Sequence, residues 1–202
     1  MVLLYLETNF LMSIATGRDP SASTLLSDPP SDVQLAIPQV CFLEALAVLE
    51  EESRQRKSFT SLLDRQILQL SRDVTSSHAA ALRTSLDAAR VENKKVLEDI
   101  HERLSDSMGL MGSIGELIGL TSRVLDAARN FDLIEDPTDN LILRCILEHA
   151  RAHPDTTKAF MSNNRKDFGS KRVQDALQAA GIGKYVVETN QFLGWYRSQP
   201  SS

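Results

Sequence analysis

The sequence predicts an α/β domain that carries an all-helical insertion at about residues 51–131. Two observations support this fold class: apolar segments typical of strands alternate with helical segments at both ends of the chain, and the middle shows helical periodicity alone. A length of 202 residues and a hydrophobic fraction of 42% suit a domain with one core. We therefore expect residues 1–202 to form a single domain that ends in a disordered tail at 197–202.

The N-terminal elements follow from short local signals. Residues 2–6 (VLLYL) are uniformly apolar, as in a buried parallel strand, and residues 9–15 predict the next helix. Residues 17–32 are rich in Gly, Pro, Ser and Asp and predict a loop with room for one helical turn. A strand at 33–37 comes next, and the helix expected at 38–54 begins at a proline, whose missing N–H costs nothing in a first turn.

The rest of the chain is expected to be helical in the middle and alternating again at its end. Residues 59–107 show a helical pattern that suits two helices, one containing 62–70 and one containing 81–104, and a further helix is expected at 117–128. The Gly-rich segment 109–119 is expected to form a turn plus a closely packed helix face, with a phosphate-binding loop as the alternative that the missing Lys-Ser/Thr disfavours. Asp136 and Pro137 form a helix start, an N-cap acid followed by proline in the first position. The C-terminal elements are expected as a helix to about 152, a strand at 157–162, a helix at 171–180, a strand at 184–187 and a helical segment at 191–196.

Composition excludes several classes of protein. The net charge of -5 gives no overall basic signature of nucleic-acid binding, although a basic patch can be local. Cys41 and Cys145 lie far apart outside any CxxC motif, so we expect buried free thiols and neither a disulfide nor a structural zinc site. No segment has the roughly 18 uninterrupted apolar residues of a membrane span, and Glu7 interrupts the N-terminal run before a signal peptide forms. We expect a cytoplasmic protein without membrane contact.

Acidic residues stand at the edges of four apolar elements. Glu7 follows the first strand, Glu44 and Asp139 lie early on helices, and Asn164 and Asp167 follow a later strand. Sites in open α/β folds form outside the carboxyl ends of the strands, so these side chains could converge. Oxygen ligands alone suit Mg²⁺ or Mn²⁺, and phosphodiester hydrolysis is the natural reaction class.

Each of these residues also has a purely structural interpretation. The alternatives are a helix cap for Glu7, an exposed helical position for Glu44, a capping-box acid for Asp139, the helix N-cap for Asp136, and turn formation for Asn164 and Asp167. The sequence around Glu44 is apolar on both sides, whereas a solvated carboxylate usually has polar neighbours. The coincidence of all of them at element boundaries favours the functional interpretation.

Other chemistries have weaker support. His149 and His153 stand at i, i+4 without the Glu of an HExxH motif, so we do not expect a zinc site there, and no GxSxG elbow is present. Arg165, Lys166 and Lys171 flank the proposed acidic cluster. They could form a solvated face or hold a phosphate backbone.

Four segments resemble the motifs of PIN-domain nucleases and occur in the order of that family. They are YLETNFL, IPQVCFLEALAVL, DPTDNLILRCILEHA and FMSNNRKDF. The resemblance covers roughly residues 1–50 and 132–190. It implies a three-layer α/β/α fold around a central parallel sheet, and an endoribonuclease that hydrolyses RNA phosphodiester bonds with water activated by Mg²⁺ or Mn²⁺.

Carried over residue by residue, the resemblance implies four catalytic and metal-binding acids. These are Glu7, Glu44, Asp139 and Asp167. The residues expected to support them are Thr8, Asn9, Asp136, Ser162 and Asn164, and those expected to bind substrate are Arg165, Lys166 and Lys171.

The chain departs from the family pattern in two places. Glu7 stands where Asp is usual and reaches one methylene further. The helical block at 51–131 is unlike the compact toxin ribonucleases, so we do not assume an antitoxin partner and leave that partner open. The block could be a substrate platform, a homodimer interface or a partner-binding arm. Two functions follow: a nuclease acting on RNA, with DNA as the alternative substrate, and a weakly active or inactive PIN-like module that binds RNA or protein.

Overall fold

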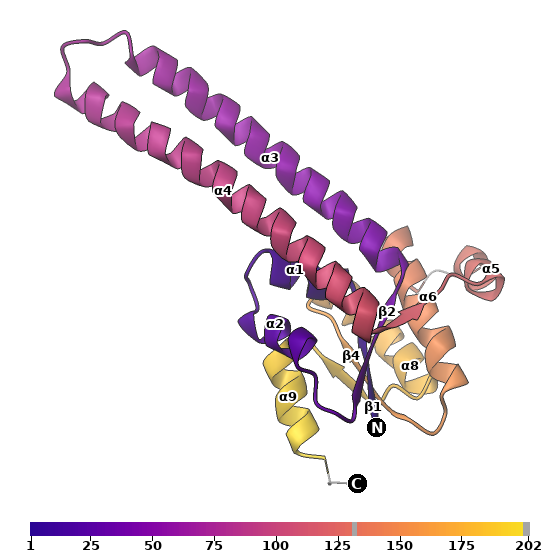
Figure 1. Ribbon diagram of the computed structural model, residues 1–202. Helices are drawn as coiled ribbons and strands as arrows, with labels where there is room; N and C mark the ends of the chain where they lie inside the picture. The colour runs from indigo at the N-terminus through magenta and orange to yellow at the C-terminus, as the bar shows by residue number, and fades with distance from the viewer. Residues whose placement is uncertain (131–132, 200–202) are drawn as a thin grey trace. The chain divides into compact units, whose positions relative to one another are not determined.

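The computed structural model describes residues 1–130 and 133–199, and the chain divides into two compact units (Figure 1). The first unit comprises residues 1–45 and 104–202, and the second comprises residues 46–103. The expected insertion at 51–131 and the single domain remain predictions. Of the tail expected at 197–202, residue 197 is the last of a helix and residues 198–199 form the turn after it. Residues 200–202 lie outside the described residues.

A five-stranded, all-parallel sheet lies at the centre of the first unit. Its order is β3-β2-β1-β4-β5. The strands are β1 (Val2–Leu6), β2 (Val33–Pro38), β3 (Glu116–Ile118), β4 (Thr157–Met161) and β5 (Lys184–Val186). All five residues of β1 are buried, as expected for a central parallel strand covered on both faces.

Helices cover both faces of this sheet. The helices α1 (Thr8–Ala15), α2 (Pro20–Ser27) and α9 (Thr189–Arg197) lie on one side, whereas α6 (Pro137–Ala152) and α8 (Lys171–Ala179) lie on the other (Figure 1). Helix α9 contacts β4 and β5, and α6 contacts β2 and β3. The predicted three-layer α/β/α fold is confirmed.

Local signals explain where the best predicted helices begin. Asp136 caps α6 as expected: one carboxylate oxygen accepts hydrogen bonds from the backbone N–H groups of Thr138 at 2.8 Å and Asp139 at 3.1 Å. Asp19 caps α2 in the same way, and Pro20 occupies the first turn. The loop expected at 17–32 is therefore wrong in part, because the buried face of α2 stabilises eight helical residues within a loop-like composition.

The elements between β2 and α6 differ most from the prediction. Pro38 ends β2, and the next helix, α3 (Val40–Leu70), continues far beyond its expected end near residue 54. Helix α4 (Ser77–Ile114) continues through residues 109–114, so this part of the Gly-rich segment is helical, and the turn expected in the segment is absent from those residues. The helix expected from residue 117 is wrong at its start: residues 116–118 form β3, because they pair with β2, and α5 (Ser122–Asn130) begins later.

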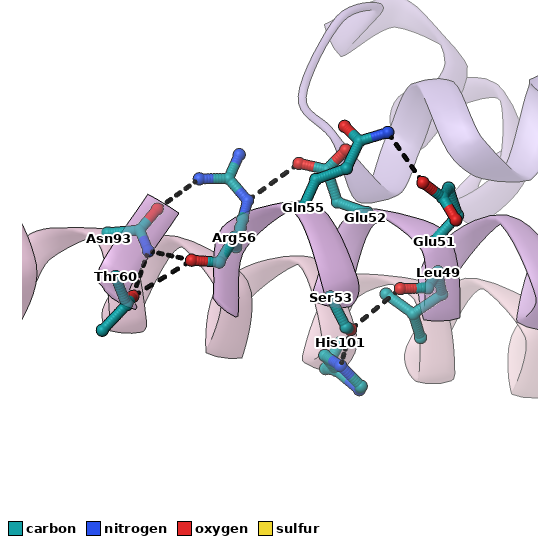
Figure 2. A network of polar contacts seen from close by, with 9 residues as sticks. All are labelled: Leu49, Glu51, Glu52, Ser53, Gln55, Arg56, Thr60, Asn93 and His101. Atoms are coloured by element: carbon teal, nitrogen blue, oxygen red, sulfur yellow. Dashed lines mark hydrogen bonds and ion pairs between the residues drawn. The ribbon is translucent and has the colours of Figure 1, made fainter. Parts of the chain in front are cut away.

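The second unit consists of helical segments of α3 and α4 joined by polar contacts. Asn93 accepts a hydrogen bond of 3.1 Å from Arg56 and donates to Thr60 at 3.0 Å (Figure 2). Ser53 and the ring of His101 lie 3.2 Å apart in the same network. These contacts come from both helices, so they fix the pairing of the two segments within this unit.

Cys41 and Cys145 are both free and buried, as expected. Among the residues described, no helix combines the length and hydropathy that a membrane span requires.

Candidate active site

The proposed acidic residues lie at the carboxyl ends of three neighbouring strands. Glu7 follows β1 and is the N-cap of α1, and Glu44 lies in the early turns of α3 after β2. Asp139 lies in the first turn of α6. Asp167 lies in the short helix α7 (Arg165–Phe168) that follows β4, with Asn164 as its N-cap. The order of β2, β1 and β4 in the sheet brings these elements to one edge.

Glu7 is a buried carboxyl group with one unpaired oxygen. Its side chain is 2% exposed, and its Oε2 accepts a hydrogen bond of 2.6 Å from the backbone N–H of Asn9. Its Oε1 is buried with no hydrogen-bond partner. Burial raises the pKa of Glu7 to about 7, the Asn9 amide and the Ser162 side chain oppose the rise, and the charges of Asp139 and Glu44 add to it.

Thr8 holds the second acid of the cluster. Its hydroxyl donates a short hydrogen bond to Oε2 of Glu44, and Thr8 itself is buried at 4% exposure. Burial raises the pKa of Glu44, and the charge of Asp136 raises it further, whereas the bond from Thr8 opposes the rise. Glu44 is thus a partly buried, oriented carboxylate, which differs from the exposed helical position considered as its alternative.

Asn164 connects the third and fourth acids. Its side-chain amide donates hydrogen bonds of 3.0 Å to Asp139 and 2.9 Å to Asp167. The backbone N–H of Asn164 donates in turn to the buried hydroxyl of Ser162 at 3.1 Å. Burial is the main cause that raises the pKa of Asp139 to about 7. The charges of Glu44, Asp136 and Asp167 add to the rise, whereas the hydrogen bond from the Asn164 amide opposes it. One amide therefore holds two carboxylates beside each other.

The four acids influence one another electrostatically, although they are not packed as tightly as the ligands of a single ion. The carboxylate charges of Glu44 and Asp139 both raise the pKa of Glu7, and Glu44 and Asp167 raise that of Asp139. Within residues 1–130 and 133–199, no three of these acids have ligand atoms that all lie within 4.8 Å of one another. The cluster is an oxygen-rich, negatively charged region that a cation would stabilise.

The basic residues expected to bind substrate differ in their availability. Arg165 and Lys166 are exposed on α7, next to Asp167. Burial and the charge of Glu7 raise the pKa of Tyr185, which donates a hydrogen bond to the backbone of Ser162, and the nearby charge of Arg165 opposes that rise. Lys171 is exposed at the start of α8 but forms an ion pair with Asp175. Arg165 and Lys166 are therefore the better placed cations.

A pocket of about 540 Å³ opens beside Glu7 on the face formed by α1, α2 and α9. Arg18, in the connection between α1 and α2, places a cation in this pocket beside the acids Glu7, Asp19 and Glu188, and the sequence alone does not mark it. Hydrogen bonds from Thr189 to Asp19 and from Ser21 to Asn190 join the two walls of the pocket. No local signal marks Arg18, because its position at the site depends on how α2 and α9 pack.

Comparison with known proteins finds one similar family. A family model described as PIN domain matches residues 4–168, a range that contains Glu7, Glu44, Asp139 and Asp167. No curated protein and no solved structure gave a significant match.

Proposed function

The chain belongs to the PIN-domain family, and we propose that it is a nuclease that uses Mg²⁺ or Mn²⁺ to hydrolyse phosphodiester bonds of RNA. Members of this family are generally nucleases. The observation that supports the proposal best is the unpaired, buried Oε1 of Glu7 beside three further acids. A buried carboxylate oxygen without a partner is costly unless a ligand satisfies it.

The residues of the cluster fit a hard divalent cation. Glu7, Glu44, Asp139 and Asp167 offer only oxygen atoms, which Mg²⁺ and Mn²⁺ prefer. These four side chains would hold the ion. When bound, Mg²⁺ or Mn²⁺ would offset charge on the scissile phosphate and lower the pKa of a water molecule.

The remaining polar residues would orient the acids. Thr8 fixes Glu44, the backbone amide of Asn9 fixes Glu7, and Asn164 sets the spacing of the other two carboxylates. These donors already orient the carboxylates, and a bound cation would draw the acids closer together than they lie without it. Such preorganisation is what a site requires to act on a phosphate.

We propose that single-stranded RNA approaches over α7 and the pocket beside Glu7. Arg165 and Lys166 would contact backbone phosphates on one side, and Arg18 would do so in the pocket. The protein carries a net charge of -5, so attraction to a polyanion would depend on these local cations. DNA remains the alternative substrate, and the same cations would bind it.

Cleavage of single-stranded RNA with Mn²⁺ tests this function. We expect Asp139→Asn and Glu44→Gln each to lower the rate by at least about 100-fold, because loss of a ligand should cost no less than loss of a residue that supports one. Asp136→Asn is the matched control: it removes a neighbouring charge but keeps a side chain that caps helices well. Equal activity of wild type, Asp139→Asn and Glu44→Gln would refute the proposal.

A second candidate function is a PIN-fold module that binds RNA without cleaving it. The observation in its favour is a hollow of about 840 Å³ in the second unit, whose cationic lining residues are Arg56, Lys57, Arg90, Lys94 and Lys95. Several of these charges are offset: Arg90, for example, forms ion pairs with Asp64 and Asp87. Titration calorimetry with Mn²⁺ separates the candidates, because absent metal binding together with retained RNA binding would favour the module.

A further inference from the structure

Glu116, His149 and His153 form a cluster of potential ligands away from the acidic site. One ligand atom of each lies within 4.8 Å of those of the other two, and all three side chains are half-buried. The histidines stand one turn apart on α6, with ring centroids 4.3 Å apart, because residues at i and i+4 share a helix face. Glu116 comes from β3, and this strand contacts α6.

This cluster is separate from the proposed active site. Asp139 and His149 lie at opposite ends of α6. An α-helix rises 1.5 Å per residue, so these two positions are about 15 Å apart along the axis. A ligand at this cluster would therefore bind independently of the acidic site.

Neighbouring groups orient the two imidazole rings of this cluster. Nδ1 of His153 lies 2.9 Å from the backbone carbonyl of His149. Since a carbonyl oxygen only accepts, this nitrogen carries the proton, and Nε2 of the neutral ring keeps a free lone pair. Nε2 of His149 lies 3.0 Å from the carboxylate of Glu116, and because a carboxylate only accepts, this nitrogen carries the proton in the metal-free protein while Nδ1 accepts from the hydroxyl of the buried Tyr5 at 3.0 Å. A cation bound at Nε2 would displace that proton, as metal binding to histidine requires. Partners of this kind typically orient histidine ligands of metals.

We propose that Glu116, His149 and His153 form a binding site for Zn²⁺ or a similar borderline cation. Two imidazoles and one carboxylate suit zinc, whereas Mg²⁺ prefers oxygen ligands alone. Ligand atoms of tetrahedral zinc are about 3.3 Å apart, given bond lengths near 2.0 Å. The 3.0 Å between Nε2 of His149 and Oε1 of Glu116 is close to that spacing, and His153 needs a small adjustment. A fourth position stays open to water.

The HExxH template missed this site because it looks for the Glu between the two histidines. Here the carboxylate comes from β3, 33 residues before His149. A bound cation would join this three-residue edge strand to α6. Zinc should therefore stabilise the fold as well as bind to it.

The histidines could instead serve only a structural network, and His153 distinguishes the two roles. The contacts of His149 with Tyr5 and Glu116 satisfy a buried hydroxyl without any metal. The side chain of His153 takes no part in those two contacts. Replacing it should leave the network intact and remove a ligand.

Titration calorimetry with Zn²⁺ and visible absorption with Co²⁺, both on the full chain, test the proposal. We expect wild type and Asp139→Asn to bind Zn²⁺ at this site and to give the spectrum of four-coordinate cobalt. His153→Gln should lower the affinity by more than about 10-fold and lose that spectrum, since even a residue that only supports a ligand contributes this much. Excess Mg²⁺ should not compete.

Melting curves supply an independent readout and a folding control. Zn²⁺ should raise the melting temperature of wild type, Asp139→Asn and His78→Gln, the last being an exposed histidine of the second unit. It should not raise that of His153→Gln or Glu116→Gln, even where these variants melt like wild type without metal. Wild-type zinc affinity in His153→Gln, or loss of all zinc binding in Asp139→Asn, would overturn the proposal.

Discussion

Asn164 donates a hydrogen bond of 3.0 Å from its side-chain amide to Asp139, across 25 residues of sequence. The same amide group donates to Asp167 at 2.9 Å, so it separates two acids that would otherwise repel each other. Asn164 therefore links the segment that follows β4 to the start of α6.

We expect Asn164→Ala to weaken Mn²⁺ binding by about 10- to 100-fold, the range typical of residues that support metal ligands. Without the amide, the pKa of Asp139 should rise further, since the amide is what lowers it. Calorimetry with Mn²⁺ measures the loss. Asn163→Ala is the matched control, because the neighbouring side chain is exposed and should leave the affinity unchanged.

The hydroxyl of Thr8 should matter more than its methyl group. Thr8→Val keeps the shape of a buried side chain but removes the donor to Glu44. Hydrogen bonds to charged groups contribute about 1.5–3 kcal/mol, so we expect a roughly 10- to 100-fold loss of metal affinity. Thr8→Ser keeps the hydroxyl and should retain most of the metal affinity of the wild type. Similar affinities for the two variants would mean that the bond to Glu44 does not prepare the site.

Local signals explain the part of the fold that the sequence predicts well. The strand at 2–6 is uniformly apolar, and α6 begins with an acid and a proline, so neither depends on distant residues. In contrast, β3 has only three residues, and its pairing with β2 decides its structure. Helix α2 was missed because burial of Leu25 and Leu26 outweighs its loop-like composition.

The candidate site also combines residues that local sequence signals mark with residues whose position depends on packing. Glu7 and Asp139 stand at boundaries that the sequence marks, so their convergence follows from the order of parallel strands. Arg18 and Glu116 carry no such mark. The first reaches its pocket through the packing of α2 and α9, and the second meets two histidines from a different element.

Metal binding should depend on pH near neutrality. The pKa values of Glu7 and Asp139 are both raised to about 7, chiefly by burial, and a cation must displace any proton they carry. A group with this pKa is mostly protonated at about pH 6 and mostly ionised at about pH 8, so each should raise Mn²⁺ affinity about 10-fold over that interval. Calorimetry at both values measures the change. An affinity that is the same at both would contradict these pKa shifts.

Glu7 should destabilise the metal-free protein above neutral pH. Its pKa rises from 4.5 to about 7 on folding. Between these values the unfolded carboxyl ionises while the folded one keeps its proton, so stability falls as the pH rises and the cost is complete above about pH 7. At about 1.36 kcal/mol per pKa unit, this cost is on the order of 3 kcal/mol.

We therefore expect Glu7→Gln to raise the free energy of unfolding at about pH 8, by less than this amount because the bond from Asn9 weakens. At about pH 4 the two proteins should differ little. Mn²⁺ should stabilise wild type and leave Glu7→Gln unchanged. Denaturant unfolding at both pH values tests this, and a variant that is less stable than wild type at pH 8 would contradict the expectation.

Arg165 should contribute to RNA binding through backbone phosphates. It is exposed on α7 beside Asp167, and no ion pair holds it among the described residues. We expect Arg165→Ala to weaken binding of single-stranded RNA of any sequence and to lower the slope of log affinity against log salt by about 0.7, the value for one phosphate contact on a single strand. Binding should be measured by fluorescence anisotropy at several salt concentrations, without divalent metal so that cleavage cannot interfere.

Lys171→Ala is the matched control for that measurement. It removes an equal charge from the next helix, but Lys171 is already paired with Asp175. Its substitution should change the salt slope less than that of Arg165, because an offset charge contributes less to the field that attracts a phosphate. Equal slopes for the two variants would mean that RNA senses only the total charge of this surface and that α7 is not its path to the acidic cluster.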